Sequence, residues 1–445
     1  MDLLFLTPSL SSTSHDVQLC KGLSKALASM DHQVTLIAPY DPKVNLQGLA
    51  LAKRLQSIEV TGSDQEEPIT FNMYDGRSAA GVKIVLLGQQ GDSPWVPPHD
   101  NPQAWHDAEA MHRRHAKQWL KALEQFIKEA APPFDLVHAV SWLGILGLAE
   151  LQLPQSIYKV LTLGSDSSGI HQRDATETLK QAIGHADHIS FCNTAPASLV
   201  EAIPELQSAG ISAIGVDNST WNPATDTHLP YRFDAMDLHG KAMCKSWFQN
   251  QQELPLSPHA LITLICDSNQ IADMLPALSI ALEQAMQLAV IITHGELTEE
   301  QASALDELRN RWPERFAWHT ANTEDELHAP IAASDYTALL TEQSTLLPAC
   351  LQSYGTFPII TQAHPLQHSV VDCDAEMRSG NGLCIQALEQ EALVHGIQRA
   401  LTLFAQSPNF RALRRHMMQV DHSWNRSAHL HESIYVSLDD SSHAA

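Results

Sequence analysis

Short apolar runs that alternate with helical stretches are the feature that most restricts the fold of this chain. The run DLLFLT (residues 2–7) is followed by residues 17–33, whose apolar side chains recur at helical spacing, and then by VTLIAP (34–39). This is a β-α-β pattern, in which the right-handed crossover makes the two strands parallel. The same alternation returns at residues 134–140, 157–163 and 186–192. The first half of the chain is therefore predicted to form a Rossmann-like sheet.

A second series of apolar runs follows LPLSP (254–258), which we interpret as a hinge. These runs lie at residues 260–266, 288–293, 316–320, 336–341 and 356–361. At 445 residues the chain is also longer than one hydrophobic core usually serves. We therefore expect an α/β fold of two Rossmann-like domains that face each other across a cleft. Ligands of such sheets bind outside the carboxyl ends of the strands.

Composition argues against several classes of function. The net charge is −24, from 27 basic and 51 acidic residues, which disfavours nucleic acid or an anionic membrane as the main partner. No run of about 18 apolar residues occurs and the first residues lack a basic stretch, so neither a membrane span nor a secretory signal is expected. We expect a cytoplasmic location. The seven cysteines include no CxxC pair, which favours reduced thiols over disulfides or a zinc cage.

The proline-containing loop NSTWNPATDTHLPYRFD (218–234) lies between the two series and predicts an ordered crossing. With its flanks (215–249) it resembles the inter-domain connection of bacterial glycogen and starch synthases. The Trp, Asn-Pro, Thr-Asp and Lys-Ala-x-x-Lys elements stand in the family's order. Further stretches resemble the same family in the right order, at residues 134–142, 186–202, 333–360 and 421–428.

The resemblance covers nearly the whole chain and implies the glycosyltransferase-B fold, in which the last helix crosses back to the first domain. It implies an N-terminal domain over residues 1–250, a C-terminal domain over 251–420, and a crossover helix with a frayed tail over 421–445. The family transfers glucose from ADP-glucose to the non-reducing end of an α-1,4-glucan by a metal-free mechanism, so no cofactor is expected.

The family's donor-binding residues are mostly replaced in the first domain. Helix N-termini, glycine loops and fixed cations hold the leaving diphosphate in such enzymes. The family's lysine-and-glycine loop aligns with Ser12, Thr13, Ser14 and His15, and an aspartate that follows it aligns with Gln18. The aspartate of the family's His-Asp-Trp-His segment aligns with Ser141, and the cleft histidine aligns with Leu161. The tryptophan of that segment is kept as Trp142.

The second domain has lost the positive charges of the family. The arginine and lysine that clamp the diphosphate align with Leu264 and Asn269. A family loop keeps its glutamate as Glu342, which is either a surviving sugar-binding carboxylate or the cap of a helix that begins near residue 344. Other side chains stand where the family has its cysteine and glycines, namely Ser344, Thr345 and His364.

We interpret the chain as a retained scaffold with a dismantled donor site, a pseudo-glycosyltransferase that binds, scaffolds or regulates. Removing one donor to a developing anion costs roughly 10²–10³ in rate, so the loss of several loops and both cations argues against catalysis. We expect no catalytic residue, and either a protein or a glucan as the partner. The alternative is an active glycosyltransferase with an altered donor, in which His15, His364 or other cations supply the charge.

Three histidines allow a second interpretation of the replaced loops. His15, His364 and His368 lie at or beside the former glycine positions, where they could form a zinc site or a phosphate clamp. Because the chain contains 24 histidines, chance placement is the preferred interpretation and no metal is expected.

Overall fold

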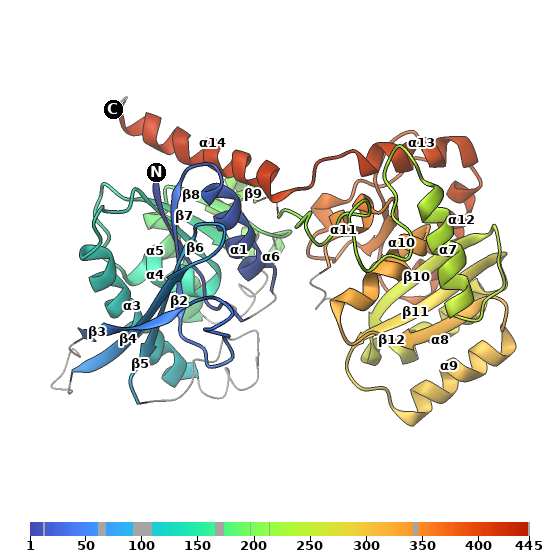
Figure 1. Cartoon of the computed structure of the whole chain (residues 1–445), viewed down its shortest axis with the longest axis horizontal. Coiled ribbons are helices and arrows are strands. Elements are labelled where there is room, and N and C mark those ends of the chain that lie inside the picture. Colours follow the sequence, from blue (N-terminus) through green and yellow to red (C-terminus); the bar gives the residue numbers. More distant parts are fainter. Residues whose placement is uncertain are drawn as a thin grey trace. The chain divides into compact units, whose positions relative to one another are not determined.

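The computed structural model describes residues 1–11, 14–60, 68–91, 109–164, 173–195, 197–212, 214–340 and 346–443. The chain divides into two compact units (Figure 1). Unit 1 consists of Met1–Gly215 and Ser423–Ala445, and unit 2 of Val216–His422. Each unit is built on one sheet with helices on its faces, which confirms the predicted α/β fold of two Rossmann-like domains.

The sheet of unit 1 has nine strands in the order β3-β4-β5-β2-β1-β6-β7-β8-β9. The strands from β5 to β9 run parallel in this order, and β3 and β4 form an antiparallel arm at one end. The five predicted strands are confirmed, whereas β3, β4, β5 and β9 were not predicted. The bounds are β1 Asp2–Leu6, β2 Gln33–Pro39, β3 Ala52–Val60, β4 Ile69–Arg77, β5 Lys83–Gln89, β6 Leu136–Val140, β7 Tyr158–Leu163, β8 His188–Phe191 and β9 Gly210–Ile211.

Helices cover both faces of this sheet because its central strands are apolar on both sides. On β1, Leu4 and Leu6 pack in one core with α3 and α4, whereas Leu3 and Phe5 pack in the other with α1 and α14. Residues 3–6 of this strand are therefore buried, as expected for a parallel sheet between two helical layers. The helix bounds are α1 His15–Ala28, α3 Glu109–Lys128, α4 Ser141–Glu150, α5 Arg173–His185, α6 Ala197–Ala202 and α14 Trp424–His443.

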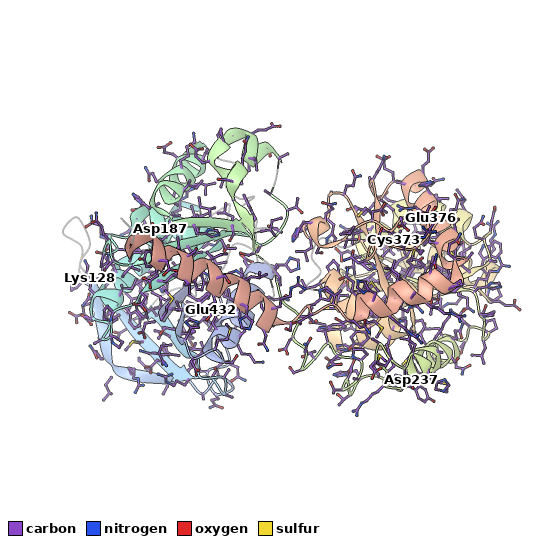
Figure 2. All side chains as sticks on the ribbon, turned by 90° about the horizontal axis from the view of Figure 1, so that it is seen from above. Lys128, Asp187, Asp237, Cys373, Glu376 and Glu432 are labelled. Carbon is purple, nitrogen blue, oxygen red and sulfur yellow. The ribbon has the colours of Figure 1, made fainter. Side chains whose placement is uncertain are left out.

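The last helix, α14, returns to unit 1, as the resemblance implied. Trp424 at its start packs so closely on α1 that a Cβ atom on Gly22 would lie 2.0 Å from the indole. Glu432, labelled in Figure 2, pairs with His32 beyond the end of α1 at 3.1 Å. The helix continues through residues 437–443, which the sequence had suggested to be frayed.

A buried hydrogen-bond chain also fixes α14 to the sheet. His138 of β6 is fully buried and contacts the Tyr435 hydroxyl at 2.6 Å through Nδ1 and the Thr162 hydroxyl at 2.7 Å through Nε2. Further along the helix, His431 contacts the Ser212 hydroxyl at 3.2 Å. Burial lowers the pKa of both imidazoles, that of His138 well below its ordinary value, and neighbouring histidines lower it further. Both rings are therefore neutral in the folded protein at neutral pH.

Unit 2 contains a parallel sheet of six strands in the order β12-β11-β10-β13-β14-β15. The five predicted strands are confirmed as β10 to β14, and β15 was not predicted. The strand bounds are β10 Ala260–Asp267, β11 Met286–His294, β12 Phe316–Thr320, β13 Tyr336–Leu339, β14 Phe357–Thr361 and β15 Leu383–Ile385. The helices are α7 His239–Gln251, α8 Ile271–Ala281, α9 Glu299–Arg311, α10 His328–Ala333, α11 Pro348–Ser353, α12 Gln390–Phe404 and α13 Ser407–Met418.

The chain passes between the units at residue 215, earlier than the expected boundary at 250. The crossing loop belongs to unit 2 because Trp221 stacks on His328, with ring centroids 3.8 Å apart. The Asp226 carboxylate is buried there and accepts hydrogen bonds from Tyr354 at 2.5 Å and His328 Nδ1 at 2.7 Å. Residues 254–258, the predicted hinge, also lie within unit 2. Among the described residues, no helix has both the length and the apolar character that a membrane crossing requires.

Candidate ligand-binding edges of the two sheets

The strand order of unit 1 reverses between β1 and β6. From β1 the chain continues to β2 on one side, whereas β6, β7 and β8 follow one another on the other side. In open α/β sheets such a reversal is where ligands bind, outside the carboxyl ends of the strands. We call this side of each sheet its carboxyl edge, and the opposite side its amino edge.

Asp16 is the most unusual side chain at the carboxyl edge of unit 1. It lies in the first turn of α1, the helix that follows β1, and it is completely buried. Neither carboxylate oxygen has a hydrogen-bond partner within the described part of the chain. Buried carboxylates are usually paired, because losing hydration without a replacement is costly. The positive end of the α1 dipole is the one feature of the helix that favours its charge.

The neighbouring strands bring a strained serine and a close glycine to the same edge. Ser141 directly follows β6 with a backbone φ of 65°, which costs a non-glycine residue on the order of 1–3 kcal/mol. Its hydroxyl is buried and makes no hydrogen bond within the described residues. Gly164 follows β7, and a Cβ atom there would lie 2.8 Å from Asp16 Oδ2, so only glycine leaves room for the carboxylate.

The other sequence-predicted positions of unit 1 are spread over this region. Ser14 precedes α1 without a side-chain capping bond, His15 begins the helix with 8 % of its surface exposed, and Gln18 is half-buried one turn later. Leu161, in contrast, lies inside β7, where it pairs with Ala139 and Ile189 in the core. Ser12 and Thr13 lie outside the described residues.

The carboxyl edge of unit 2 holds an acidic and an imidazole side chain. Asp267 ends β10 and lies 3.1 Å from Nδ1 of His294, which ends the neighbouring strand β11. Gln270 closes the turn after β10, because its side chain accepts from the Asp267 N–H and donates to the Leu340 carbonyl. Sequence reasoning missed Asp267 and His294, although each is the polar residue that ends an apolar strand.

The sequence-predicted positions of unit 2 do not form one cluster. Leu264 is completely buried inside β10, three residues before the strand ends at Asp267, whereas Asn269 is exposed in the following turn. His364 serves the turn after β14, since its Nδ1 accepts from the Leu366 N–H at 3.1 Å. His368 is two residues further along, and burial lowers its pKa. The remaining predicted positions, Glu342, Ser344 and Thr345, lie outside the described residues.

Cations are absent from the sequence of the carboxyl-edge loops of unit 2. The segments that follow β10, β11, β13 and β14 are residues 268–270, 295–298, 340–347 and 362–369, and none contains lysine or arginine. Two cations instead contact Asp335, which precedes β13 at the amino edge. Lys245 Nζ lies 2.8 Å and Arg414 Nη2 2.7 Å from its two oxygens.

Asp335, Lys245 and Arg414 form a cluster of ion pairs with a structural role. Burial opposes ionisation of this carboxyl group, but Lys245 and Arg414 outweigh it and hold its pKa well below the ordinary value. Burial also lowers the pKa of the nearby Lys241, whose Nζ donates to the Ala332 carbonyl at 3.0 Å. Among the described residues, no group of three or more His, Cys, Asp or Glu side chains is arranged to hold a metal ion.

Comparisons with known proteins show that the chain is similar to glycogen synthases. It is 25% identical to the glycogen synthase of Anaeromyxobacter sp. (strain Fw109-5) over 98% of this chain and 99% of that protein. The glycogen synthase of Anaeromyxobacter dehalogenans is 32% identical over 50% of this chain and 47% of its own length. That of Yersinia pseudotuberculosis serotype O:1b is 28% identical over 68% and 67%. No protein-family model matches the chain.

Solved structures give the same fold. The catalytic domain of starch synthase IV from Arabidopsis thaliana, bound to ADP and acarbose, has a TM-score of 0.75 at 18% identity, over 98% of this chain and 99% of that one. Sucrose-phosphate synthase from Thermosynechococcus elongatus has a TM-score of 0.58 at 14% identity, over 99% and 100%. These likenesses establish the glycosyltransferase-B fold. Along its whole length the chain is similar to glycogen synthases, at a divergent level of identity.

Proposed function

We propose that this chain is a non-catalytic member of its family, which binds α-glucan at the carboxyl edge of unit 1 and does not use a sugar nucleotide. The observation that carries the proposal is the chemistry of the carboxyl edge of unit 2. Its loops contain no lysine or arginine, and Asp267 stands at the end of its central strand β10.

Electrostatics decides against a diphosphate at this edge. Breaking a sugar-diphosphate bond places charge on the leaving group, and preorganised donors are what stabilise it. Loss of one such donor costs roughly 10²–10³ in rate, and here a carboxylate at Asp267 adds repulsion. The imidazole of His294 lies at the same edge, and it already contacts Asp267 at 3.1 Å.

The carboxyl edge of unit 1 supports binding of a hydroxyl-rich ligand. Asp16 offers two buried acceptor oxygens that no described residue uses, and the Ser141 hydroxyl beside β6 is similarly available. Sugar hydroxyl groups are donors that match a carboxylate acceptor. The strained backbone of Ser141 is the kind of local cost that persists at binding sites. We therefore assign the glucan, rather than a nucleotide, to this edge.

Thermal unfolding of the full chain tests the proposal. ADP-glucose, UDP-glucose, ADP and maltotriose are added separately, and we expect maltotriose alone to raise the unfolding temperature. A ligand at a hundred times its Kd stabilises by about 2.7 kcal/mol, which is readily measured. Stabilisation by either sugar nucleotide, or transfer of glucose from it to maltotriose, would contradict the non-catalytic reading and favour an enzyme with an altered donor.

Two isosteric variants separate glucan binding from general stability. Asp16→Asn removes the buried charge, so we expect equal or higher stability without ligand but weaker maltotriose binding. The control is Asp31→Asn, at an exposed turn position after α1, which should change neither. Unchanged maltotriose binding in Asp16→Asn would exclude the carboxyl edge of unit 1 as the glucan site.

A further inference from the structure

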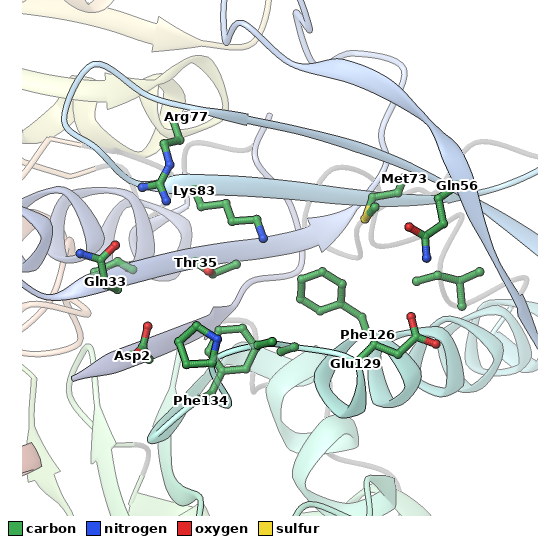
Figure 3. A pocket seen from close by; sticks show the side chains of 15 residues that line it. Asp2, Gln33, Thr35, Gln56, Met73, Arg77, Lys83, Phe126, Glu129 and Phe134 are labelled. Carbon is green, nitrogen blue, oxygen red and sulfur yellow. The ribbon is translucent and has the colours of Figure 1, made fainter.

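We propose a second carbohydrate-binding site in unit 1, at the amino edge of the sheet and on the opposite side from Asp16. A cavity of about 540 Å³ lies there between the antiparallel arm, the start of β2 and the end of α3. Figure 3 shows Lys83 reaching from β5 into this space, with Phe126 of α3 and Glu129, the residue after this helix, on the other side. The volume falls within the range of small-molecule sites, roughly 300–1,000 Å³.

The charges of the lining select a neutral ligand. Two lining residues are basic, Arg77 and Lys83, and two are acidic, Asp2 and Glu129. These charges cancel, so the cavity does not favour an anion such as a phosphate or a cation such as an amine. The ligand must instead use donors and acceptors together.

Aromatic rings supply an apolar wall for the same ligand. Phe126 and Phe134 both line the cavity, with ring centroids 6.4 Å apart and an angle of 32° between the rings. Both are only half-buried, so part of each ring faces the open space. A pyranose ring presents C–H groups on its faces and hydroxyl groups around its edge, which fits an aromatic wall with a polar rim.

The polar rim contains side chains that make no hydrogen bond to other residues described by the structure. The Lys83 ammonium lies 5.7 Å from the Phe126 centroid and has no hydrogen-bond acceptor among the described residues, although it carries three donors. Gln33 and Gln56 line the cavity with exposed side-chain amides, each both donor and acceptor. A neutral oligosaccharide of two or three sugar rings is the ligand class that satisfies these groups, the rings and the charge balance.

The choice of an α-1,4-linked probe rests on the proposed function, whereas the ligand class follows from the lining itself. Isothermal titration of the full chain with maltotriose provides the test, with cellotriose as a second neutral sugar. We expect two binding events for maltotriose in the unaltered chain. Lys83→Met, Gln33→Ala and Phe126→Leu should each weaken one event at least about fivefold, the effect of losing one hydrogen bond or ring contact.

Matched variants make the two sites distinguishable. Gln155→Ala, at an exposed position elsewhere in unit 1, should leave both events unchanged. A single event that Asp16→Asn removes and the cavity variants do not affect would overturn this inference and leave the proposed function standing. A single event that only the cavity variants remove would support this inference and contradict the carboxyl-edge assignment. If neither trisaccharide binds, both proposals are wrong.

Discussion

Replacement of Asp335 by asparagine should destabilise unit 2 more than any comparable change of a surface charge. The side chain is 7% exposed and contacts two cations, Lys245 and Arg414, whose side chains are only 16% and 11% exposed. Its Oδ2 atom also accepts from the Leu261 N–H at 3.0 Å. Asparagine keeps the shape and can keep the last bond, but it leaves both cations without a counter-charge.

The expected loss follows from the burial of this cluster. Removing one partner of a buried ion pair costs about 3–5 kcal/mol, because the remaining charge is desolvated and uncompensated. An exposed pair contributes about 0–1 kcal/mol. Asp306 provides the control, since it pairs with Arg309 at 3.7 Å with both side chains about half exposed. Asp306→Asn should therefore cost less than about 1 kcal/mol.

Urea unfolding followed by hydrogen exchange is the appropriate assay. A chain of two units does not unfold in one step, so a single transition cannot be assigned without local information. Exchange of amides in β10, β13 and α7 should rise in Asp335→Asn, whereas those of β1 and β6 should stay unchanged. A loss below about 1 kcal/mol, or one located in unit 1, would refute the view that this carboxylate holds the amino edge of unit 2 together.

Two further outcomes are expected in unit 1. Because the pKa values of His138 and His431 are lowered in the folded state, the unfolded chain binds more protons below about pH 6.5, and unit 1 should lose stability as the pH falls through that range. Amide exchange of α14 between pH 7 and pH 5 measures this, and stronger protection at pH 5 would contradict it. Gly22→Ala should cost roughly 1–3 kcal/mol in urea because its Cβ would meet Trp424 at 2.0 Å, whereas Gly184→Ala, with no atom within 4 Å, should be neutral or stabilising by up to about 1 kcal/mol. Equal effects of the two alanines would show that Trp424 does not pack as described.

The parallel strands could be predicted from the sequence because they are continuous apolar runs between helices. The antiparallel arm could not, since most of β3 is exposed on both faces and its Leu55 is fully open to solvent. Most of this strand has neither an apolar run nor an alternating pattern. It pairs with β4, and Ile58 and Val60 near its end are buried in the core. The boundary between the units was also misplaced, because prolines at 254–258 suggest a break in the chain but do not reveal that Trp221 and Asp226 are buried in unit 2.

The candidate site was harder to predict than the fold, because the sequence of a buried strand does not indicate at which residue the strand ends. The family alignment puts its cleft histidine at Leu161 and its clamp arginine at Leu264, yet each of these residues lies inside a strand. Gly164 and Asp267 are the residues at the corresponding strand ends. Asp16 could not be recognised from sequence, since nothing in a helix pattern indicates that a carboxylate is buried without partners. The lack of cations in the loops of unit 2, in contrast, needs only the strand bounds and the sequence.

The return of α14 to unit 1 has a consequence for biosynthesis. The ribosome releases the segments of unit 2 before it releases Trp424–His443, although these residues complete the core around Leu3 and Phe5. During translation one apolar face of the unit 1 sheet therefore stays incompletely covered until Trp424–His443 has left the exit tunnel. The ribosome therefore synthesises the first strands of unit 1 before unit 2, but the core of unit 1 is completed only after unit 2 has been synthesised.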